Sequence, residues 1–484
     1  MWRRCAILKR CFGMDSVRTK LLLIVALLLL LGIQGKGALG APEHDLVTNL
    51  PGQPAVPFKQ YAGYVTVDSH AGRALFYYFV EAHSHASSRP LALWLNGGPG
   101  CSSIGGGAFT ELGPFYPNGT GRGLVKNSNS WNKAANILFL ESPAGVGWSY
   151  SNRSEDYSIY NDAKTAKDSV TFMLRWFDAF PEYKSREFYI TGESYAGHYV
   201  PQLAAALLDY NKAAGHSVFN VKGVAIGNPA LNLAIDTAST YDFLWSHGLI
   251  SDKTYEGLGR SCYWSDYDHG SGNNNVSAEC NQFISNSALE MGDHVNPYDI
   301  ILDVCVPSIV EQEFRLKKRM GHRSIGVDVC MSYERYYYFN LPEVQKALHA
   351  NTTGLPYPWT NCDGPVQYDI NDMRLDIVPV LRDLLKNGLR VWVFSGDEDA
   401  VVPFLGTRVN VNSLAQELKL RTTASYKAWF LRTQVGGWAE SFGNLTFATV
   451  RGAAHMVPLA QPARALLLFQ KFISGQPLPA SPYS

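Results

Sequence analysis

Short apolar runs that end abruptly in glycine-rich or charged turns recur along this chain and most constrain its fold. The clearest is Leu91–Leu95, which passes directly into Asn-Gly-Gly-Pro-Gly. Runs of this length and composition are typical of buried strands in a largely parallel sheet. The sequence therefore predicts strands at 91–95, 136–140, 187–190, 221–226, 390–394 and 445–450.

Helical patterns lie between these runs. Apolar residues recur at helical spacing in 163–180, the segment 201–210 is rich in leucine and alanine, and 462–473 closes the chain with a leucine-rich pattern. This alternation predicts an α/β fold, with a mostly parallel sheet and helices on both of its faces. Active sites in such sheets lie at the carboxyl ends of the strands, where the turns fall.

The alternation breaks between residues 233 and 364. This stretch holds five of the six cysteines that follow residue 40, the segment 270–276, which is rich in glycine and asparagine, and the basic cluster Lys317–Arg319. We expect a cap inserted into the sheet, so that 41–232 and 365–484 form the two parts of the core. The basic cluster is either a processing site in an exposed loop or a solvated patch, and the sequence leaves both open.

Residues 1–40 have the features of a secretory signal peptide. The apolar run 21–31 follows two basic residues, is too short to span a bilayer, and leads to small residues before Ala41. We expect cleavage after Gly40, with an uncleaved signal anchor as the alternative. The segment before the apolar run is long, so the sequence leaves open whether translation starts at Met1 or at Met14.

Composition excludes several classes of protein. Hydrophobic residues make up 46% and charged residues 17% of the 484 residues, which fits a folded globular protein rather than a disordered chain, a coiled coil or a collagen-like fibre. Lys plus Arg and Asp plus Glu both number 42, so the formal net charge is zero. Because only one short basic run occurs, we do not expect nucleic-acid binding.

Cysteines and glycosylation acceptors agree with a secretory route. Six cysteines remain after residue 40, an even number that suggests three disulfides, and sequence alone leaves their pairing open. Neither a CxxC pair nor an HExxH motif occurs, so we expect no metal site and no cofactor. The motif that accepts N-linked glycans occurs five times. The acceptors are Asn118, Asn152, Asn275, Asn351 and Asn444.

The segment Tyr189–Gly197 has the strand–turn–helix arrangement of a nucleophile elbow, which presents a serine oxygen at the edge of a sheet. Ser194 would be the nucleophile. Ala196 stands where the G-x-S-x-G pattern has its second glycine, and alanine is still small enough for close packing of strand and helix. A purely structural turn is the alternative interpretation.

A serine nucleophile needs a base and an orienting acid, which follow it in the order acid, then histidine, in α/β-hydrolases. Asp397 and Asp399 both follow one predicted strand, and His455 follows the next. The sequence leaves the choice between the two aspartates open. His198 lies too close to Ser194 along the helix to serve as base, and we expect it to be structural.

Five blocks of the sequence are long and distinctive. They are Trp94–Ser103, Glu141–Gly147, Gly192–Gly197, Gly396–Asp399 and Gly452–Pro458. They resemble the signature blocks of the serine carboxypeptidases, above all the plant serine carboxypeptidase-like members, and the resemblance covers about residues 50 to 475. It implies an α/β-hydrolase fold with a disulfide-stapled cap. It also implies Ser194 as nucleophile, His455 as base and Asp399, rather than Asp397, as orienting acid.

An acid, Glu193, lies directly beside this nucleophile. An ionised carboxylate there would repel an anionic substrate, whereas a protonated carboxyl donates a hydrogen bond to the terminal carboxylate of a peptide. The resemblance adds Glu111 as its partner and Asn96 as a further donor. Two close carboxyl groups raise each other's pKa, so we expect a C-terminal carboxylate to bind best in acid. A solvated acid favoured by the helix dipole is the alternative.

Further parts of the site are also implied by the resemblance. It places the backbone amides of Gly98 and Tyr195 in the oxyanion hole, where donors stabilise the transition state. It places Met456 in the pocket for the leaving residue, where a thioether favours hydrophobic over basic residues. It pairs Cys101 with Cys362, Cys262 with Cys280, and Cys305 with Cys330.

Together these features predict a secreted or vacuolar serine carboxypeptidase that releases C-terminal residues from peptides and proteins at acidic pH through an acyl-enzyme on Ser194. We expect no membrane association after signal cleavage and leave a homodimer open. An acyltransferase that uses glucose esters is one alternative, although such relatives tend to carry Asp and Ser at the positions of Glu193 and Ala196, and to lose Asn96. A non-catalytic protein on the same fold is the other.

Overall fold

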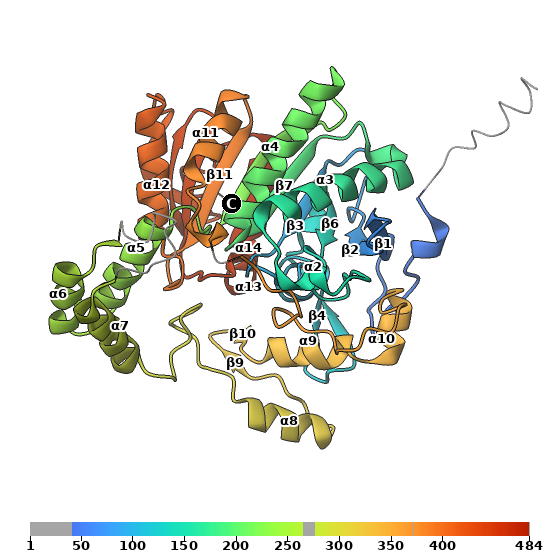
Figure 1. Ribbon diagram of the computed structural model, residues 1–484, viewed down its shortest axis with the longest axis horizontal. Coiled ribbons are helices and arrows are strands. Elements are labelled where there is room, and N and C mark those ends of the chain that lie inside the picture. Colours follow the sequence, from blue (N-terminus) through green and yellow to red (C-terminus); the bar gives the residue numbers. More distant parts are fainter. Residues whose placement is uncertain (1–40, 265–275, 370, 484) are drawn as a thin grey trace, which may run out of the picture.

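A ten-stranded sheet runs through the computed structural model, which describes residues 41–264, 276–369 and 371–483 (Figure 1). In spatial order the strands are β1 (Gln60–Asp68), β2 (Arg73–Val80), β6 (Asn136–Leu140), β3 (Leu91–Leu95), β7 (Phe188–Glu193), β8 (Val221–Gly227), β11 (Arg390–Gly396), β14 (Leu445–Val450), β13 (Gln434–Phe442) and β12 (Ala424–Leu431). The strands from β6 to β14 are parallel, and an antiparallel pair extends the sheet on each side.

The central parallel strands are the six that the sequence predicts, so the mostly parallel sheet is confirmed. The two outer pairs were not predicted. β2 is an apolar run, but it ends at a glutamate rather than at a glycine-rich turn. β12 and β13 lie at an edge of the sheet, most of their positions are exposed or half-buried, and they contain no continuous apolar run.

Helices and short elements fill the connections. The helices are α2 (Glu155–Ser158), α3 (Asp162–Ala179), α4 (Ala196–Ala214), α5 (Leu233–Ser246), α6 (Asp252–Ser261), α7 (Ala278–Met291), α8 (Pro307–Arg315), α9 (Met331–Phe339), α10 (Pro342–Ala347), α11 (Val378–Lys386), α12 (Phe404–Glu417), α13 (Val457–Ala460) and α14 (Pro462–Ser474). Shorter helical segments are η1 (Glu43–Asp45), η2 (Ile104–Glu111), η3 (Trp131–Lys133), η4 (Pro181–Tyr183) and η6 (Asp372–Arg374). Two small ribbons pair β4 (Phe115–Pro117) with β5 (Leu124–Lys126) and β9 (Arg323–Ser324) with β10 (Val327–Asp328).

The sheet has one hydrophobic core on each face. Successive residues of β2 point to opposite faces, so Tyr77 and Phe79 enter one core and Phe76 and Tyr78 enter the other. The first core also takes buried side chains from α3, α4, α11 and α12, and the second from η2, α9 and α14. Burying each large apolar side chain stabilises the fold by about 1.5–3 kcal/mol, so helices on both faces hold the sheet in place.

The helix predicted at 201–210 is longer than expected. The sequence predicts it only at 201–210, the part that is rich in leucine and alanine. The structure starts α4 at Ala196, directly after the turn that ends β7, and the helix runs through Pro201 to Ala214. The other two predicted helices match α3 and α14 closely.

Among the described residues, the segment 233–364 adds no strand to the ten-stranded sheet. It holds α5 to α10 and the ribbon of β9 and β10, and Figure 1 shows α6 to α10 gathered below the sheet. Its division from the core as a separate cap stays a prediction. Lys317, Lys318 and Arg319 are exposed in the loop that follows α8.

Three disulfides cross-link this segment internally or at its end. Cys262 bonds to Cys280 and Cys305 to Cys330 within it, and Cys101 bonds to Cys362 at its end. These are the pairs that the resemblance implies. The last bond joins the end of the segment to the loop after β3, so the segment is anchored beside the carboxyl ends of the strands.

The predicted glycosylation acceptors differ in their surroundings. Asn152 and Asn444 are exposed, whereas Asn118 and Asn351 are half-buried. The fifth acceptor, Asn275, lies outside the described residues, as do the predicted signal peptide, both candidate start methionines and most of the segment 270–276. Glycosylation therefore stays a prediction at each position.

Two structural features are absent from the described parts of the chain. No helix in residues 41–264, 276–369 and 371–483 is both long and apolar enough to cross a bilayer. In the same residues, no group of three or more His, Cys, Asp or Glu side chains is arranged to hold a metal ion.

Candidate active site

Ser194 lies at the tip of the sharp turn between β7 and α4. Its φ is 61°, a left-handed conformation that is rare for residues with a side chain. Close packing demands small neighbours, since a Cβ on Gly197 would lie 2.3 Å from the carbonyl oxygen of Ala230. Ala196 fits because it faces Gly192, where an added Cβ would lie 2.7 Å from the alanine methyl. The elbow therefore tolerates this departure from the common pattern.

His455 and Asp399 meet at the carboxyl ends of two neighbouring strands. His455 Nδ1 lies 2.8 Å from Asp399 Oδ2, and both side chains are buried. Asp399 also accepts hydrogen bonds from the amide of Val401 and from the side chain of Asn228, each at 2.8 Å. Several donors thus fix the carboxylate, which in turn orients the imidazole.

The other aspartate of this loop has a different partner. Asp397 Oδ1 accepts a hydrogen bond of 2.6 Å from the backbone amide of Gly452, in the loop that leads to His455. It holds the loop rather than the imidazole. Of the two aspartates that the sequence leaves open, Asp399 is the one in contact with His455.

Ser194 and His455 line one cavity of about 460 Å³ at the carboxyl ends of the strands. The predicted site residues that share this cavity are Asn96, Gly98, Glu193 and Met456. Glu111 is fully buried and lies one layer deeper, against Asn96. The structure therefore brings the predicted side chains to a single place.

The loop after β3 packs tightly against the elbow. A Cβ on Gly97 would lie 2.3 Å from the amide nitrogen of Tyr195 and 2.9 Å from the Cβ of Ser194. Gly98, the next residue, has a φ of 111°, which glycine adopts without strain. The two backbone segments that carry the predicted oxyanion amides are therefore neighbours.

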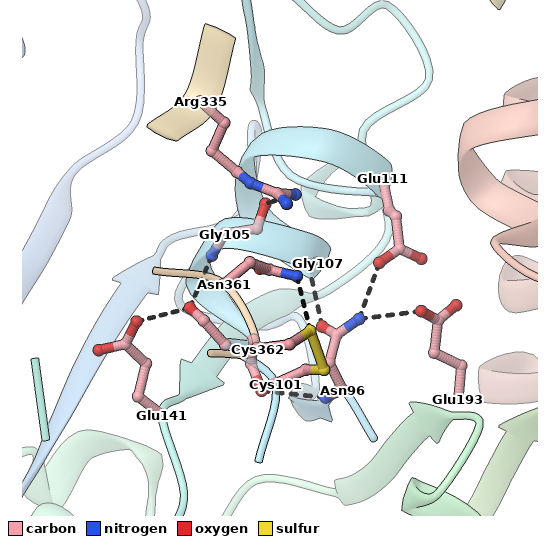
Figure 2. The surroundings of a disulfide bond; sticks show 12 residues. Asn96, Cys101, Gly105, Gly107, Glu111, Glu141, Glu193, Arg335, Asn361 and Cys362 are labelled. Atoms are coloured by element: carbon pink, nitrogen blue, oxygen red, sulfur yellow. Dashed lines mark hydrogen bonds between the residues drawn. A yellow bond between two sulfur atoms is a disulfide. The ribbon is translucent and has the colours of Figure 1, made fainter. Parts of the chain in front are cut away.

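Asn96 connects two carboxyl groups (Figure 2). Its Nδ2 donates to Glu111 Oε1 and to Glu193 Oε1, each at 2.9 Å. Its Oδ1 accepts from the indole of Trp94 at 2.7 Å and from the amide of Gly107 at 2.9 Å. These two donors fix the orientation of the amide, so its NH₂ group points toward both carboxyls.

Glu193 and Glu111 are two buried acids that each accept a hydrogen bond from Nδ2 of Asn96. Burial, reinforced by the charge of Glu111, raises the pKa of Glu193 well above its usual range. Burial also raises the pKa of Glu111. Two carboxylates around one amide group cannot both ionise without a large free-energy cost, and the pKa of Glu193 is raised more than that of Glu111.

His198 has the structural environment that its position predicts. Its Nδ1 lies 2.9 Å from Asp162 Oδ2, and both side chains are buried. Its ring stacks on the ring of Tyr195 with centroids 4.4 Å apart. It therefore fixes the residue that follows the nucleophile, and its partner is Asp162.

Sequence reasoning missed three residues around the site. Asn228, which holds Asp399, follows the end of β8, and its place after a predicted strand is a signal that could have identified it. Tyr298 accepts a hydrogen bond of 3.0 Å from the backbone amide of His455, and its ring contacts the imidazole edge to face. Arg335 lines the cavity from α9. The last two come from the inserted segment, where no local pattern marks them.

Two buried acids outside the cavity make stability depend on pH. Glu141 is fully buried near the Cys101–Cys362 disulfide (Figure 2), and it accepts a hydrogen bond of 2.7 Å from the amide of Trp148. Burial raises the pKa of Glu141 to about 7, and it raises the pKa of Asp236 to about 7 as well. Between the ordinary carboxyl pKa and pH 7, the folded chain therefore binds more protons than the unfolded chain.

We expect the free energy of unfolding to fall as the pH rises from 5 to 7.5. A raised folded pKa stabilises the fold below the unfolded pKa, and this stabilisation is lost as the pH passes the folded pKa. For Glu141 the loss is on the order of 2 kcal/mol. In urea unfolding, Glu141→Gln should lose less stability over this range than either the natural chain or the exposed control Glu279→Gln. Equal stability at both pH values would contradict this.

Comparison with known proteins agrees with this geometry. The family model described as serine carboxypeptidase matches residues 51–475. Serine carboxypeptidase-like 42 of Arabidopsis thaliana is 58% identical over 97% of this chain and 99% of its own length, and serine carboxypeptidase 24 of the same plant is 44% identical over 91% and 94%. A solved structure of Kex1(delta)p, a prohormone-processing carboxypeptidase from Saccharomyces cerevisiae, has the same fold, with a TM-score of 0.73 at 22% identity over 90% of this chain and 96% of that one.

Proposed function

The chain belongs to the serine carboxypeptidase family of hydrolases, and on that premise we propose that it releases single residues from the C-termini of peptides and proteins at acidic pH. The observation that carries the proposal is the pair of buried acids, Glu193 and Glu111, around Asn96 beside Ser194, and their raised pKa values favour a neutral carboxyl in acid. A neutral carboxyl there donates to a terminal carboxylate without repelling it. The site thereby favours the last peptide bond of a chain over internal bonds.

In the proposed reaction, Ser194 Oγ attacks the carbonyl carbon of the last peptide bond while its proton passes to Nε2 of His455. Asp399, bonded to Nδ1 at 2.8 Å, stabilises the imidazolium. The amides of Gly98 and Tyr195 stabilise the oxyanion. Nε2 then protonates the leaving nitrogen, the C–N bond breaks, and an acyl-enzyme remains. Water, deprotonated by His455, attacks the acyl carbon and releases the serine.

The proposed partners are peptide and protein C-termini, with Met456 against the side chain of the leaving residue. We propose that the enzyme acts in the vacuole or outside the cell after removal of residues 1–40. Three disulfides support this location, because such bonds persist in oxidising compartments. We propose that the protein binds neither nucleic acid nor, after signal cleavage, membranes. Sedimentation of the purified protein will decide whether it is a homodimer.

The KM for an N-blocked dipeptide is expected to rise roughly tenfold between pH 5 and pH 8. The raised pKa of Glu193 keeps its proton in acid, and the proton is lost as the pH rises, so a second negative charge then faces the substrate carboxylate. In Glu193→Gln, an amide donates at every pH, and KM should stay within about threefold across the range. Steady-state kinetics at several pH values measure both profiles.

A matched control and an altered substrate sharpen this test. Glu187→Gln changes an exposed acid at the other end of β7 and should keep the natural pH profile. A C-terminally amidated peptide removes the carboxylate, and we expect it to be trimmed at least about tenfold more slowly at pH 5. A flat KM for the natural enzyme, or equal trimming of acid and amide, would refute the proposal.

The same machinery supports acyl transfer if an alcohol replaces water at the acyl-enzyme. Asn96, Glu111 and Glu193 favour hydrolysis of peptides, because together they form a receptor for a carboxylate that a glucose ester lacks. Assaying a blocked peptide beside a glucose ester separates the two activities. Labelling with a serine-directed organophosphate separates both from a non-catalytic protein.

A further inference from the structure

Arg335 is a buried cation in the cavity that holds Ser194. It projects from α9, in the inserted segment, and its residue is only 5% exposed. Among the described residues that line the cavity, it is the sole lysine or arginine. Thr110, Leu459 and Met456 line the same cavity, and the proposed pocket for the leaving residue includes Met456.

The hydrogen bonds of Arg335 leave part of its guanidinium unused. Nη1 donates to the carbonyl of Gly105 at 2.9 Å and to the hydroxyl of Thr110, both on η2 (Figure 2). Nε is buried and has no partner in the described structure. The guanidinium also lies 5.9 Å from the centre of the ring of Trp359. A neutral side chain would bond to η2 equally well, so this contact alone does not require a charge.

The charge of Arg335 is not balanced by an ion pair. Within the described residues, its hydrogen bonds go to a carbonyl and a hydroxyl rather than to a carboxylate, and the neighbouring charge that acts on it is that of Glu111. Burial lowers its pKa to about 10, so the guanidinium remains charged in acid. Burying a cation is costly, the charge of Glu111 offsets part of that cost, and an incoming anion would offset more of it.

The carboxylate-binding residues lie next to this cation. Thr110, to which Arg335 donates, precedes Glu111 in η2. On the same segment, a Cβ on Gly106 would lie 2.7 Å from Nδ2 of Asn96. The segment η2 therefore connects the proposed carboxylate-binding residues with Arg335.

We propose that Arg335 selects leaving residues with an acidic side chain, Glu or Asp, by donating charge-assisted hydrogen bonds to the side-chain carboxylate. The selection rests on the proposed carboxypeptidase activity and names its preferred substrate. Arginine matches a carboxylate in both charge and planar geometry. The same charge opposes Lys and Arg as leaving residues.

Acidic side chains also line the cavity, and they support a competing prediction about which leaving residue is preferred. Asp299 and Asp303 come from loops of the segment 233–364, and Asp328 belongs to β10 in the same segment. The acids that act on Asp299 are Glu398 and Asp399, which places Asp299 on the histidine side rather than beside Arg335. If these aspartates governed selection, a basic leaving residue would be preferred over an acidic one.

Four N-blocked dipeptides that differ only in the C-terminal residue test the proposal: Phe-Glu, Phe-Gln, Phe-Leu and Phe-Lys at pH 5.5. Glu and Gln have nearly the same shape, so their ratio isolates the charge. We expect kcat/KM for Glu to exceed that for Gln by about 10-fold or more, with Lys lowest. In Arg335→Met, the Glu-to-Gln ratio should fall to about one. The control Arg315→Met, an exposed cation on α8, should keep the natural ratio.

The outcomes are distinguishable. A Glu-to-Gln ratio near one in the natural enzyme, a preference for Lys, or an equal loss for all four peptides in Arg335→Met would overturn the proposal. If Arg335→Met does not fold, Arg335→Lys serves instead, and it should lower the ratio while keeping Lys disfavoured. Release of none of the four residues by the natural enzyme would refute the carboxypeptidase activity itself.

Discussion

Replacing Ser194 with alanine is expected to lower kcat for C-terminal release by roughly 10⁶-fold. The turn holds this side chain at a φ of 61° in the cavity that His455 also lines, and in the proposed reaction no other hydroxyl replaces it. Residual turnover would come from substrate binding and oxyanion stabilisation alone. Single-turnover assays with a blocked peptide measure the loss.

Folding must be checked separately in this variant. Alanine at the tip of the elbow keeps a Cβ and removes one hydroxyl, so the thermal unfolding midpoint should change little. Ser158→Ala, at an exposed position of α2 outside every glycosylation motif, is the matched control and should keep full activity. Labelling by an organophosphate should disappear in Ser194→Ala alone. Substantial peptide release by that variant would exclude the proposed acyl-enzyme.

Asp399→Asn is expected to lower kcat by roughly 10⁴-fold. The carboxylate lies 2.8 Å from Nδ1 of His455, and an amide in its place favours the wrong imidazole tautomer. The NH₂ group of this asparagine would also face an N–H donor of Val401 or Asn228, and it cannot accept a hydrogen bond from either. We therefore expect some loss of stability beside the loss of rate.

Asp397→Asn is the matched control, two residues away. Its Oδ1 accepts from the amide of Gly452 at 2.6 Å, and an asparagine carbonyl accepts equally well there. We expect a change in kcat of less than about tenfold. Comparable losses in the two variants, or a larger loss for Asp397→Asn, would contradict the assignment of Asp399 as the orienting acid.

The parallel centre of the fold was predictable because each of its strands is buried on both faces and ends in a distinctive turn. That combination produces a continuous apolar run, as in β3. Of the outer strands, β12 and β13 lack it, since they meet solvent along part of their length, and β2 is an apolar run that does not end in a glycine-rich turn. Strand prediction from apolar runs therefore finds the middle of such a sheet and misses its edges.

Site residues were predictable where they follow strands. Ser194, Asp399 and His455 each occupy such a position, and their order matches the chemistry. The sequence did not separate Asp399 from Asp397, because the choice depends on which oxygen reaches the imidazole. Arg335 and Tyr298 come from a segment without regular alternation, and their approach to the cavity depends on tertiary packing alone.

The disulfides determine what a break in the exposed basic loop would do. Lys317–Arg319 lies between Cys305 and Cys330, and also between Cys101 and Cys362. A protease that cut there would produce two polypeptides still joined by two covalent cross-links. The pieces would separate on a gel only after reduction, and the larger piece, which carries Ser194, would stay attached to the smaller one, which carries His455. Maturation at this loop would therefore leave the catalytic apparatus in one covalent unit.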